Sequence, residues 1–169
     1  MTDQLPSPMR PDASRAEDLV AYLDYFRGAL LRKVEGLSED QLRTSVLPSG
    51  WSPLELVKHL TFVERRWLEW GFEGHAVEDP WGDRRDDRWH VGAGEPTADV
   101  TDALRRRGER TTEIVGRHEL TEVGAPGERW DGAEPARLER VLMHLVQEYA
   151  RHLGHLDVVR ELLDGGTGE

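Results

Sequence analysis

Three side chains that can bind a metal ion interrupt otherwise apolar helix faces in this sequence. Glu148 and His152 lie four residues apart in an amphipathic pattern over residues 137–163, and His59 occupies an inward position of an earlier pattern. Residues four apart share one face of a helix, so Glu148 and His152 can converge on one ion. Because a buried carboxylate without a partner is too costly to persist, we expect these groups to pair with one another or with a cation.

One histidine from a facing helix completes a set of three ligands, two imidazoles and a carboxylate. Zinc is the natural occupant of such a set, because its ligand distances of about 2.0–2.2 Å are reachable and a fourth position stays open for water or substrate. An open position is typical of catalytic sites. The same set also suits Fe(II), Ni(II) or Mn(II). The sequence has no cysteine, so a thiol would have to arrive as an external cosubstrate.

Other interpretations of these residues stay open. A lone His59 fits a hydrogen-bonded core histidine, and a lone pair of Glu148 and His152 fits an ordinary ion pair on a helix face. His144 forms a rival set with Glu148 and His152 at steps of four residues, but it is rotated by about 80° from His152 around the helix. His155 is either a partner beside the metal ligands or a partly exposed histidine.

Apolar residues at helical spacing predict four long helices, over about residues 14–34, 52–70, 97–118 and 137–163. The second has the clearest start, because Ser52 can cap it, Pro53 fits the first helical position and Glu55 completes a capping box. No strand-like alternation of comparable length competes with these patterns. We therefore predict an all-α fold, a four-helix bundle with long inter-helix loops.

Two connections are long for a bundle. Residues 73–96 contain Trp81, Trp89 and His90. The two tryptophans favour an ordered loop, which we expect to cover the site, with His90 as a candidate pocket wall. Residues 119–135 are expected to cross one end of the bundle. The predicted organisation is a flexible segment over 1–13, one domain over 14–165 and a frayed tail over 166–169.

Composition narrows the class of partner. A formal net charge of −11 and a pI near 5.1 disfavour DNA and RNA, which require a clustered basic surface. No segment approaches the ~20 apolar residues of a membrane span, and the first residues are polar rather than apolar. We expect a cytoplasmic protein that acts on a small molecule and binds neither nucleic acid nor membrane.

Two segments carry a resemblance to a known family. The first is Ser49-Gly-Trp-Ser-Pro-Leu-Glu-Leu-Val-Lys-His59-Leu, and the second runs from Leu142 through Glu148 and His152 to His155. They resemble the DinB/YfiT-like metalloenzyme superfamily, in particular the DinB branch named after the mini-circle protein, over about residues 15–165. Members are four-helix bundles that hold nickel or zinc, so the resemblance implies His59, Glu148 and His152 as metal ligands.

The resemblance also implies a reaction. Many members have histidine in place of Glu148, and the His/Glu/His version is similar to relatives of mycothiol-dependent maleylpyruvate isomerase. The usual His-Arg-Gly-Gln reads His152-Leu-Gly-His155 here. These features suggest a transferase or isomerase that joins a mycothiol-like thiol to a small electrophile, with His155 or Arg151 orienting substrate or moving a proton.

Two other functions remain open at this point. A metal-dependent hydrolase would use the same ligands with water in the fourth position. A non-catalytic helical binding or stress-response module would hold a structural metal or a polar core instead. A homodimer is a further expectation, since dimers are common among relatives.

Overall fold

The fold is all-α, as predicted. The computed structural model describes residue 6 and residues 13–167. The elements are α1 (Arg15–Glu35), α2 (Glu39–Arg43), α3 (Pro53–Arg65) with its π-helical continuation η1 (Arg66–Phe72), β1 (Arg84–Arg85), β2 (Arg88–Trp89), α4 (Thr97–Arg117), the 3-10 turn η2 (Glu128–Trp130) and α5 (Leu138–Asp164). The predicted segment 1–13 lies almost wholly outside the described residues, and of the predicted tail only 166–167 are described.

The helices begin where the sequence provides capping groups. Ser14, Ser38 and Ser52 each accept a hydrogen bond from the backbone three residues on, in complete capping boxes that start α1, α2 and α3. Pro53 takes the first position of α3, where its missing N–H costs nothing. Gly165 ends α5 in the left-handed conformation with φ of 75°.

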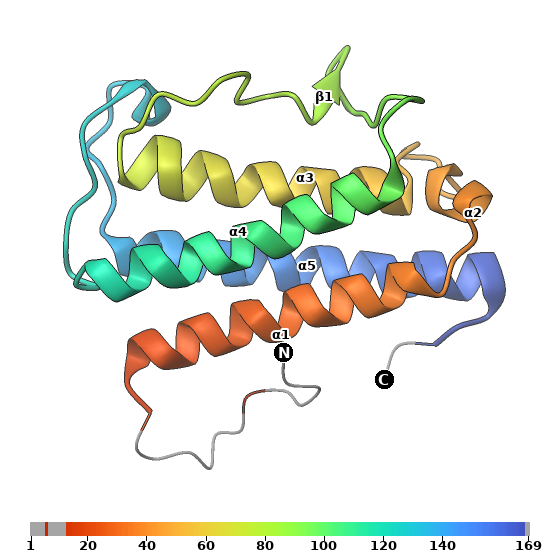
Figure 1. Ribbon diagram of the computed structural model, residues 1–169, viewed down its shortest axis with the longest axis horizontal. Coiled ribbons are helices and arrows are strands. Elements are labelled where there is room, and N and C mark those ends of the chain that lie inside the picture. The colour runs from red at the N-terminus through yellow and green to blue at the C-terminus, as the bar shows by residue number, and fades with distance from the viewer. Residues whose placement is uncertain (1–5, 7–12, 168–169) are drawn as a thin grey trace.

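The four long helices form a bundle with one long crossover (Figure 1). α1 and α5 run in one direction along the long axis, and α3 and α4 run in the other. Because α3 and α4 are parallel, the chain must return along the full length of the bundle between them. Residues 73–96 make this return over the outer side of α3, and they carry the small hairpin of β1 and β2.

One buried polar cluster in the bundle interior is centred on a carboxylate of α3. Glu64 on α3 is 1% exposed and accepts hydrogen bonds from Arg27 Nε at 2.7 Å, from Thr111 Oγ1 at 2.6 Å and from the Tyr149 hydroxyl. These partners come from α1, α4 and α5, so one carboxylate joins all four long helices. Each buried group in the cluster has a partner, which avoids the cost of unsatisfied charge.

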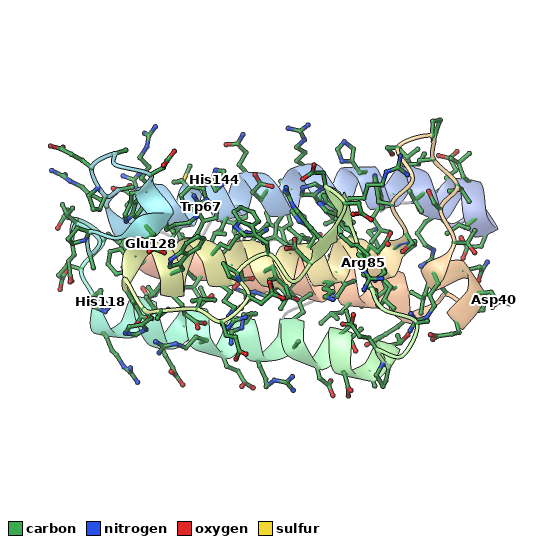
Figure 2. The ribbon with its side chains drawn as sticks, turned by 90° about the horizontal axis from the view of Figure 1, so that it is seen from above. Asp40, Trp67, Arg85, His118, Glu128 and His144 are labelled. Atoms are coloured by element: carbon green, nitrogen blue, oxygen red, sulfur yellow. The ribbon has the colours of Figure 1, made fainter. Side chains whose placement is uncertain are left out.

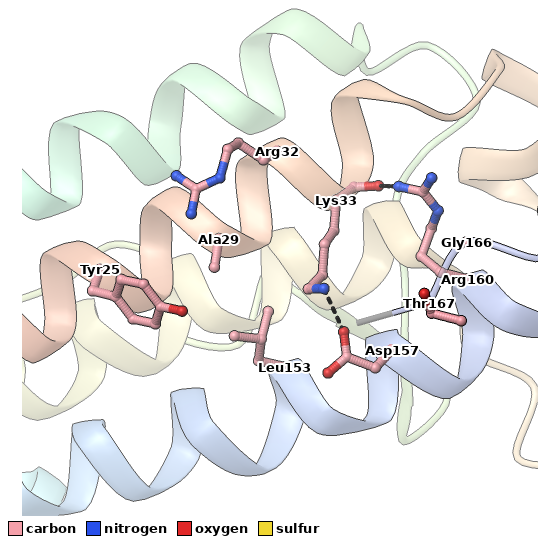
Figure 3. A pocket seen from close by; sticks show the side chains of 9 residues that line it. All are labelled: Tyr25, Ala29, Arg32, Lys33, Leu153, Asp157, Arg160, Gly166 and Thr167. Carbon is pink, nitrogen blue, oxygen red and sulfur yellow. Dashed lines mark hydrogen bonds and ion pairs between the residues drawn. The ribbon is translucent and has the colours of Figure 1, made fainter. Parts of the chain in front are cut away.

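A second polar contact set joins α1 to α5 near their C-terminal ends (Figure 3). A cleft of about 360 Å³ lies there, and Lys33 Nζ contacts Asp157 Oδ1 across it at 2.6 Å. Arg160 donates to the Lys33 carbonyl and pairs with Asp164 Oδ2 at 2.8 Å. The charges that Arg160 and Lys33 bring to this cleft are therefore used to hold the two helices together.

Three local features differ from the sequence-based expectation. The second long helix does not stay α-helical, because residues 66–72 form π-turns. The hairpin over residues 84–89 was not predicted, since its strands have two residues each and no alternation to detect. On α5, Leu162 belongs to the apolar pattern over residues 137–163 but is 59% exposed. Among the described residues, none of the helices is long and apolar enough to cross a membrane.

Candidate metal centre

The structure brings the three predicted ligands together between α3 and α5. His59, Glu148 and His152 each offer one ligand atom, and these atoms all lie within 4.8 Å of one another. His59 and His152 are buried, whereas Glu148 is half-buried. The His59 and His152 rings meet edge to face, with centroids 5.3 Å apart. Two imidazoles and one carboxylate from facing helices thus surround a single point.

Asp83 fixes the orientation of His59 from behind. His59 Nδ1 lies 2.9 Å from Asp83 Oδ2, and Asp83 is 0% exposed. Arg66, at the start of η1, donates to both Asp83 oxygens, from Nη1 at 2.6 Å and from Nη2 at 3.2 Å. Because an ionised Asp83 can only accept at Nδ1, the His59 proton resides there and Nε2 carries the free lone pair. This is the carboxylate–histidine arrangement that orients metal ligands in proteins.

Trp89 covers the other side of His59. Its indole stacks on the imidazole at 4.0 Å between centroids and 19° between planes, and it meets His152 edge-on at 5.3 Å. Trp51 lies behind Trp89 at 5.8 Å. The His59 ring is therefore held between a hydrogen-bonded carboxylate and an aromatic face, which limits its rotation and keeps water away from it.

The small hairpin supplies both of these partners. Asp83 immediately precedes β1 and Trp89 ends β2, and the His90 N–H donates to the Asp83 carbonyl at 2.8 Å to close the base. Asp86 and Asp87 form the turn with φ of 51° and 61°. Positive φ at both central residues is what a two-residue type I′ turn requires, and aspartate tolerates it. The turn chemistry thus places Asp83 and Trp89 side by side against α3.

Glu148 lies between two histidines of its own helix. Its Oε2 is 3.3 Å from His152 Nε2. In a tetrahedral site, metal–ligand distances of about 2.0–2.2 Å put the ligand atoms about 3.4 Å from one another, which is close to this separation. Its other oxygen, Oε1, is 3.4 Å from His144 Nε2. His144 turns away toward Trp67, with centroids 4.8 Å apart, and Figure 2 shows these two side chains next to each other. His144 is not part of the set of converging ligand atoms.

The two predicted catalytic residues lie outside the ligand set. His155 is exposed, and its ring meets the His152 ring edge-on at 5.7 Å. Arg151 is exposed on α5, near enough for its charge to contribute, after burial and His152, to lowering the pKa of His155. His155 therefore adjoins one metal-ligand candidate, and the roles of both residues remain predictions.

The electrostatics of the cluster suit a cation. Burial lowers the pKa of His59, partly offset by Asp83, so His59 is neutral at pH 7. The hydrogen bond from His152 lowers the pKa of Glu148. Burial raises the pKa of Asp83, but the hydrogen bonds from His59 and Arg66 lower it by more. His152 Nδ1 is buried and has no hydrogen-bond partner among the described residues, so the hydrogen-bonding capacity of this nitrogen is unmet. The residues present fit a divalent ion.

Sequence reasoning missed Asp83 and Arg66 and did not assign Trp89 to His59. Asp83 is one of several aspartates in a loop whose path no periodicity defines, so nothing in the sequence distinguishes it. Arg66 follows Arg65 on a helix, and only the change to π-turns decides which of the two points toward the loop. Trp89 beside His90 was the one available signal, because a large aromatic in a polar loop needs a surface to cover.

Comparison with known proteins identifies a family that matches this chain. No curated protein matches the sequence. The sequence profile of the mycothiol-S-transferase family matches residues 18–165, which include the three converging ligands, the hairpin, α3, α4, α5 and all of α1 but its first turn. The chain belongs to the mycothiol-S-transferase family.

Proposed function

We propose that this protein is a divalent-metal-dependent S-transferase that joins mycothiol to a small electrophile. The observation that carries the proposal is the convergence of His59, Glu148 and His152, with the buried Asp83 holding Nδ1 of His59. A purely structural ion pair would not require a neutral histidine, nor a buried carboxylate that holds the proton on Nδ1 and leaves the lone pair of Nε2 free. The family match supplies the thiol.

We assign zinc or nickel as the resident metal, with His59, Glu148 and His152 as its ligands. A set of two imidazoles and one carboxylate suits either ion and leaves coordination positions for a substrate. When bound, a divalent cation lowers the pKa of a thiol and so provides the thiolate at neutral pH. The chain has no cysteine to compete for the ion.

The residues around the ligands have separate tasks in this scheme. Asp83 and Trp89 fix the His59 ring, and Glu148 reduces the net charge of the site. The sulfur of mycothiol attacks the electrophilic carbon, an S–C bond forms, and the leaving group departs with its bonding electron pair. In this proposal His155, whose ring meets the His152 ring edge-on, accepts the thiol proton, and Arg151 orients a charged substrate.

The test begins with the metal content of protein purified without an affinity tag, alongside His59→Ala. About one equivalent of zinc or nickel in the wild type, lost in the variant, is expected. The loaded protein should then conjugate mycothiol to monochlorobimane, and a chelator should abolish the reaction. A protein that binds no divalent ion would refute the metal site, whereas a metal-loaded protein inert toward mycothiol with a panel of electrophiles would refute the transferase alone.

A further inference from the structure

A second feature of the hairpin is a groove that is lined in part by Trp89, the residue that stacks on His59. A groove of about 460 Å³ lies between the residues that precede α3 and the hairpin turn. Trp51 and Trp89 form one part of its lining, with ring centroids 5.8 Å apart and planes inclined by 51°. Figure 2 looks down on this region, where Arg85 marks the hairpin. Trp89 thus borders both the groove and the two histidines of the ligand set.

The charged side chains that the hairpin contributes to this groove have no partners among the described residues, whereas Glu55, which also lines it, accepts from the Ser52 N–H at 2.8 Å. Within the described part of the chain, the side chains of Arg85, Asp86, Asp87 and Arg88 make no hydrogen bond or ion pair with one another or with the rest. His90 Nε2, on the same lining, is buried and also has no hydrogen-bond partner there. In the cleft between α1 and α5, by contrast, Lys33 and Arg160 are already paired.

The lining chemistry selects a class of ligand. Around the turn the order is Arg85, Asp86, Asp87 and Arg88, so the two positive and two negative charges balance, and Glu55 adds one more negative charge to the lining. The groove therefore does not favour a phosphate or another strong anion. Hydroxyl groups both donate and accept, and they match a lining that holds both guanidinium and carboxylate groups. Indole faces pack against the apolar faces of saturated rings. A polyhydroxylated ring compound therefore satisfies this groove better than an apolar electrophile does.

We propose that the groove binds the glucosamine–inositol end of mycothiol and so determines which thiol the enzyme uses. The assignment rests on the proposed function, since it concerns the cosubstrate of the same site. The indole of Trp89 contacts both His59, at 4.0 Å between ring centroids, and Trp51, at 5.8 Å. The cysteinyl arm of mycothiol has to pass only this ring for its sulfur to reach the ligand set.

The test compares two thiols on metal-loaded enzyme. The variant is Asp86→Asn/Asp87→Asn, because asparagine keeps the positive φ of the turn and removes both charges. Asp131→Asn is the matched control, an exposed aspartate with φ of 49° in the other long loop and outside the groove. We measure kcat/KM for mycothiol and for N-acetylcysteine, which lacks the sugar and inositol.

Loss of charge-assisted hydrogen bonds predicts that the ratio of kcat/KM for mycothiol over N-acetylcysteine falls by about 10-fold in the double variant, through KM for mycothiol. The ratio should not change in Asp131→Asn. An unchanged ratio in the double variant, or a change confined to KM for the electrophile, would overturn the assignment.

A binding measurement keeps this inference separable from the transferase proposal. Calorimetric titration with glucosaminyl-inositol, the thiol-free end of mycothiol, should detect binding that weakens about 10-fold in the double variant and not in Asp131→Asn. If glucosaminyl-inositol binds in this way but no thiol is turned over, the groove assignment is supported and the transferase proposal is refuted. If glucosaminyl-inositol does not bind but mycothiol is turned over, the groove assignment is refuted and the transferase proposal is unaffected.

Discussion

Asp83→Asn is the substitution that best separates a metal-positioning role from a structural one. Asp83 is completely buried and serves two partners, His59 Nδ1 at 2.9 Å and Arg66 at 2.6 and 3.2 Å. Asparagine has nearly the same shape, but its single oxygen can accept from only part of this set, and its NH2 group faces donors. The substitution therefore weakens the hold on His59 and leaves Arg66, 3% exposed, without a counter-charge.

Two magnitudes follow from this geometry. Loss of the hydrogen bond that orients a metal-binding histidine typically lowers metal affinity by about 10- to 100-fold, or about 1.4–2.7 kcal/mol. Breaking a buried ion pair by removing one partner costs about 3–5 kcal/mol. Because asparagine retains one acceptor, we expect about 3 kcal/mol of lost stability. A domain with 5–15 kcal/mol of stability still folds after such a loss.

The two effects are measured separately. Zinc affinity comes from competition with a chromophoric chelator well below the unfolding temperature, and stability comes from urea unfolding in the presence of a chelator. Asp79→Asn is the control, because Asp79 lies in the same loop and has positive φ but is exposed. An Asp83→Asn protein that loses stability yet binds zinc within twofold of the wild type would refute the positioning role and leave Asp83 as the partner of Arg66 alone.

Three further outcomes are expected. Glu148→Gln should lower zinc affinity by at least about 10-fold with little change in stability, because it removes the one anionic ligand and Glu148 is only half-buried; equal affinity in equilibrium dialysis would remove Glu148 from the ligand set. His144→Ala should retain one equivalent of zinc by elemental analysis while His59→Ala loses it, since His144 points toward Trp67; loss of zinc in both would contradict this geometry. Burial raises the pKa of Tyr149 well above its usual value, so its contribution to stability is complete below about pH 10 and is lost as the pH rises further. Tyr149→Phe should thus be less stable by about 1–3 kcal/mol at pH 7 and should lose less stability than the wild type between pH 10 and 11 in urea titrations.

The bundle could be predicted from the sequence because its information is local and periodic. The start of α3 needs only Ser52, Pro53 and Glu55, which specify a capped helix within four residues. The change to π-turns at Arg66 could not be predicted in this way, since the apolar spacing through Trp67 and Trp70 also fits a regular helix. At Arg66 the π-helical backbone coincides with contacts between this side chain and the returning loop, and local sequence preference does not encode those contacts.

In the candidate site, too, the residues on helices could be predicted and the residues on loops could not. His59, Glu148 and His152 lie on helices, so periodicity alone places their side chains on facing surfaces. Asp83 lies on the crossover, whose path depends on where the hairpin docks. The loop also contains Asp79, Asp86 and Asp87, and the sequence offers no reason to select Asp83 from these four. A ligand supported by a regular element is therefore predictable, whereas its hydrogen-bond partner on a loop is not.

The helices that carry the ligands also join the buried polar cluster, and this connection explains how the ligands face one another. Glu148 belongs to the ligand set, and the next residue, Tyr149, donates to Glu64 in the core. Successive helical residues project about 100° apart, so fixing Tyr149 on Glu64 sets the rotation of α5 and turns Glu148 toward His59. On the facing helix, Glu64 lies five residues after His59 and two before Arg66. The Glu64 contacts therefore hold α3 and α5 in the one relative rotation at which an imidazole, a carboxylate and a second imidazole can reach the same ion.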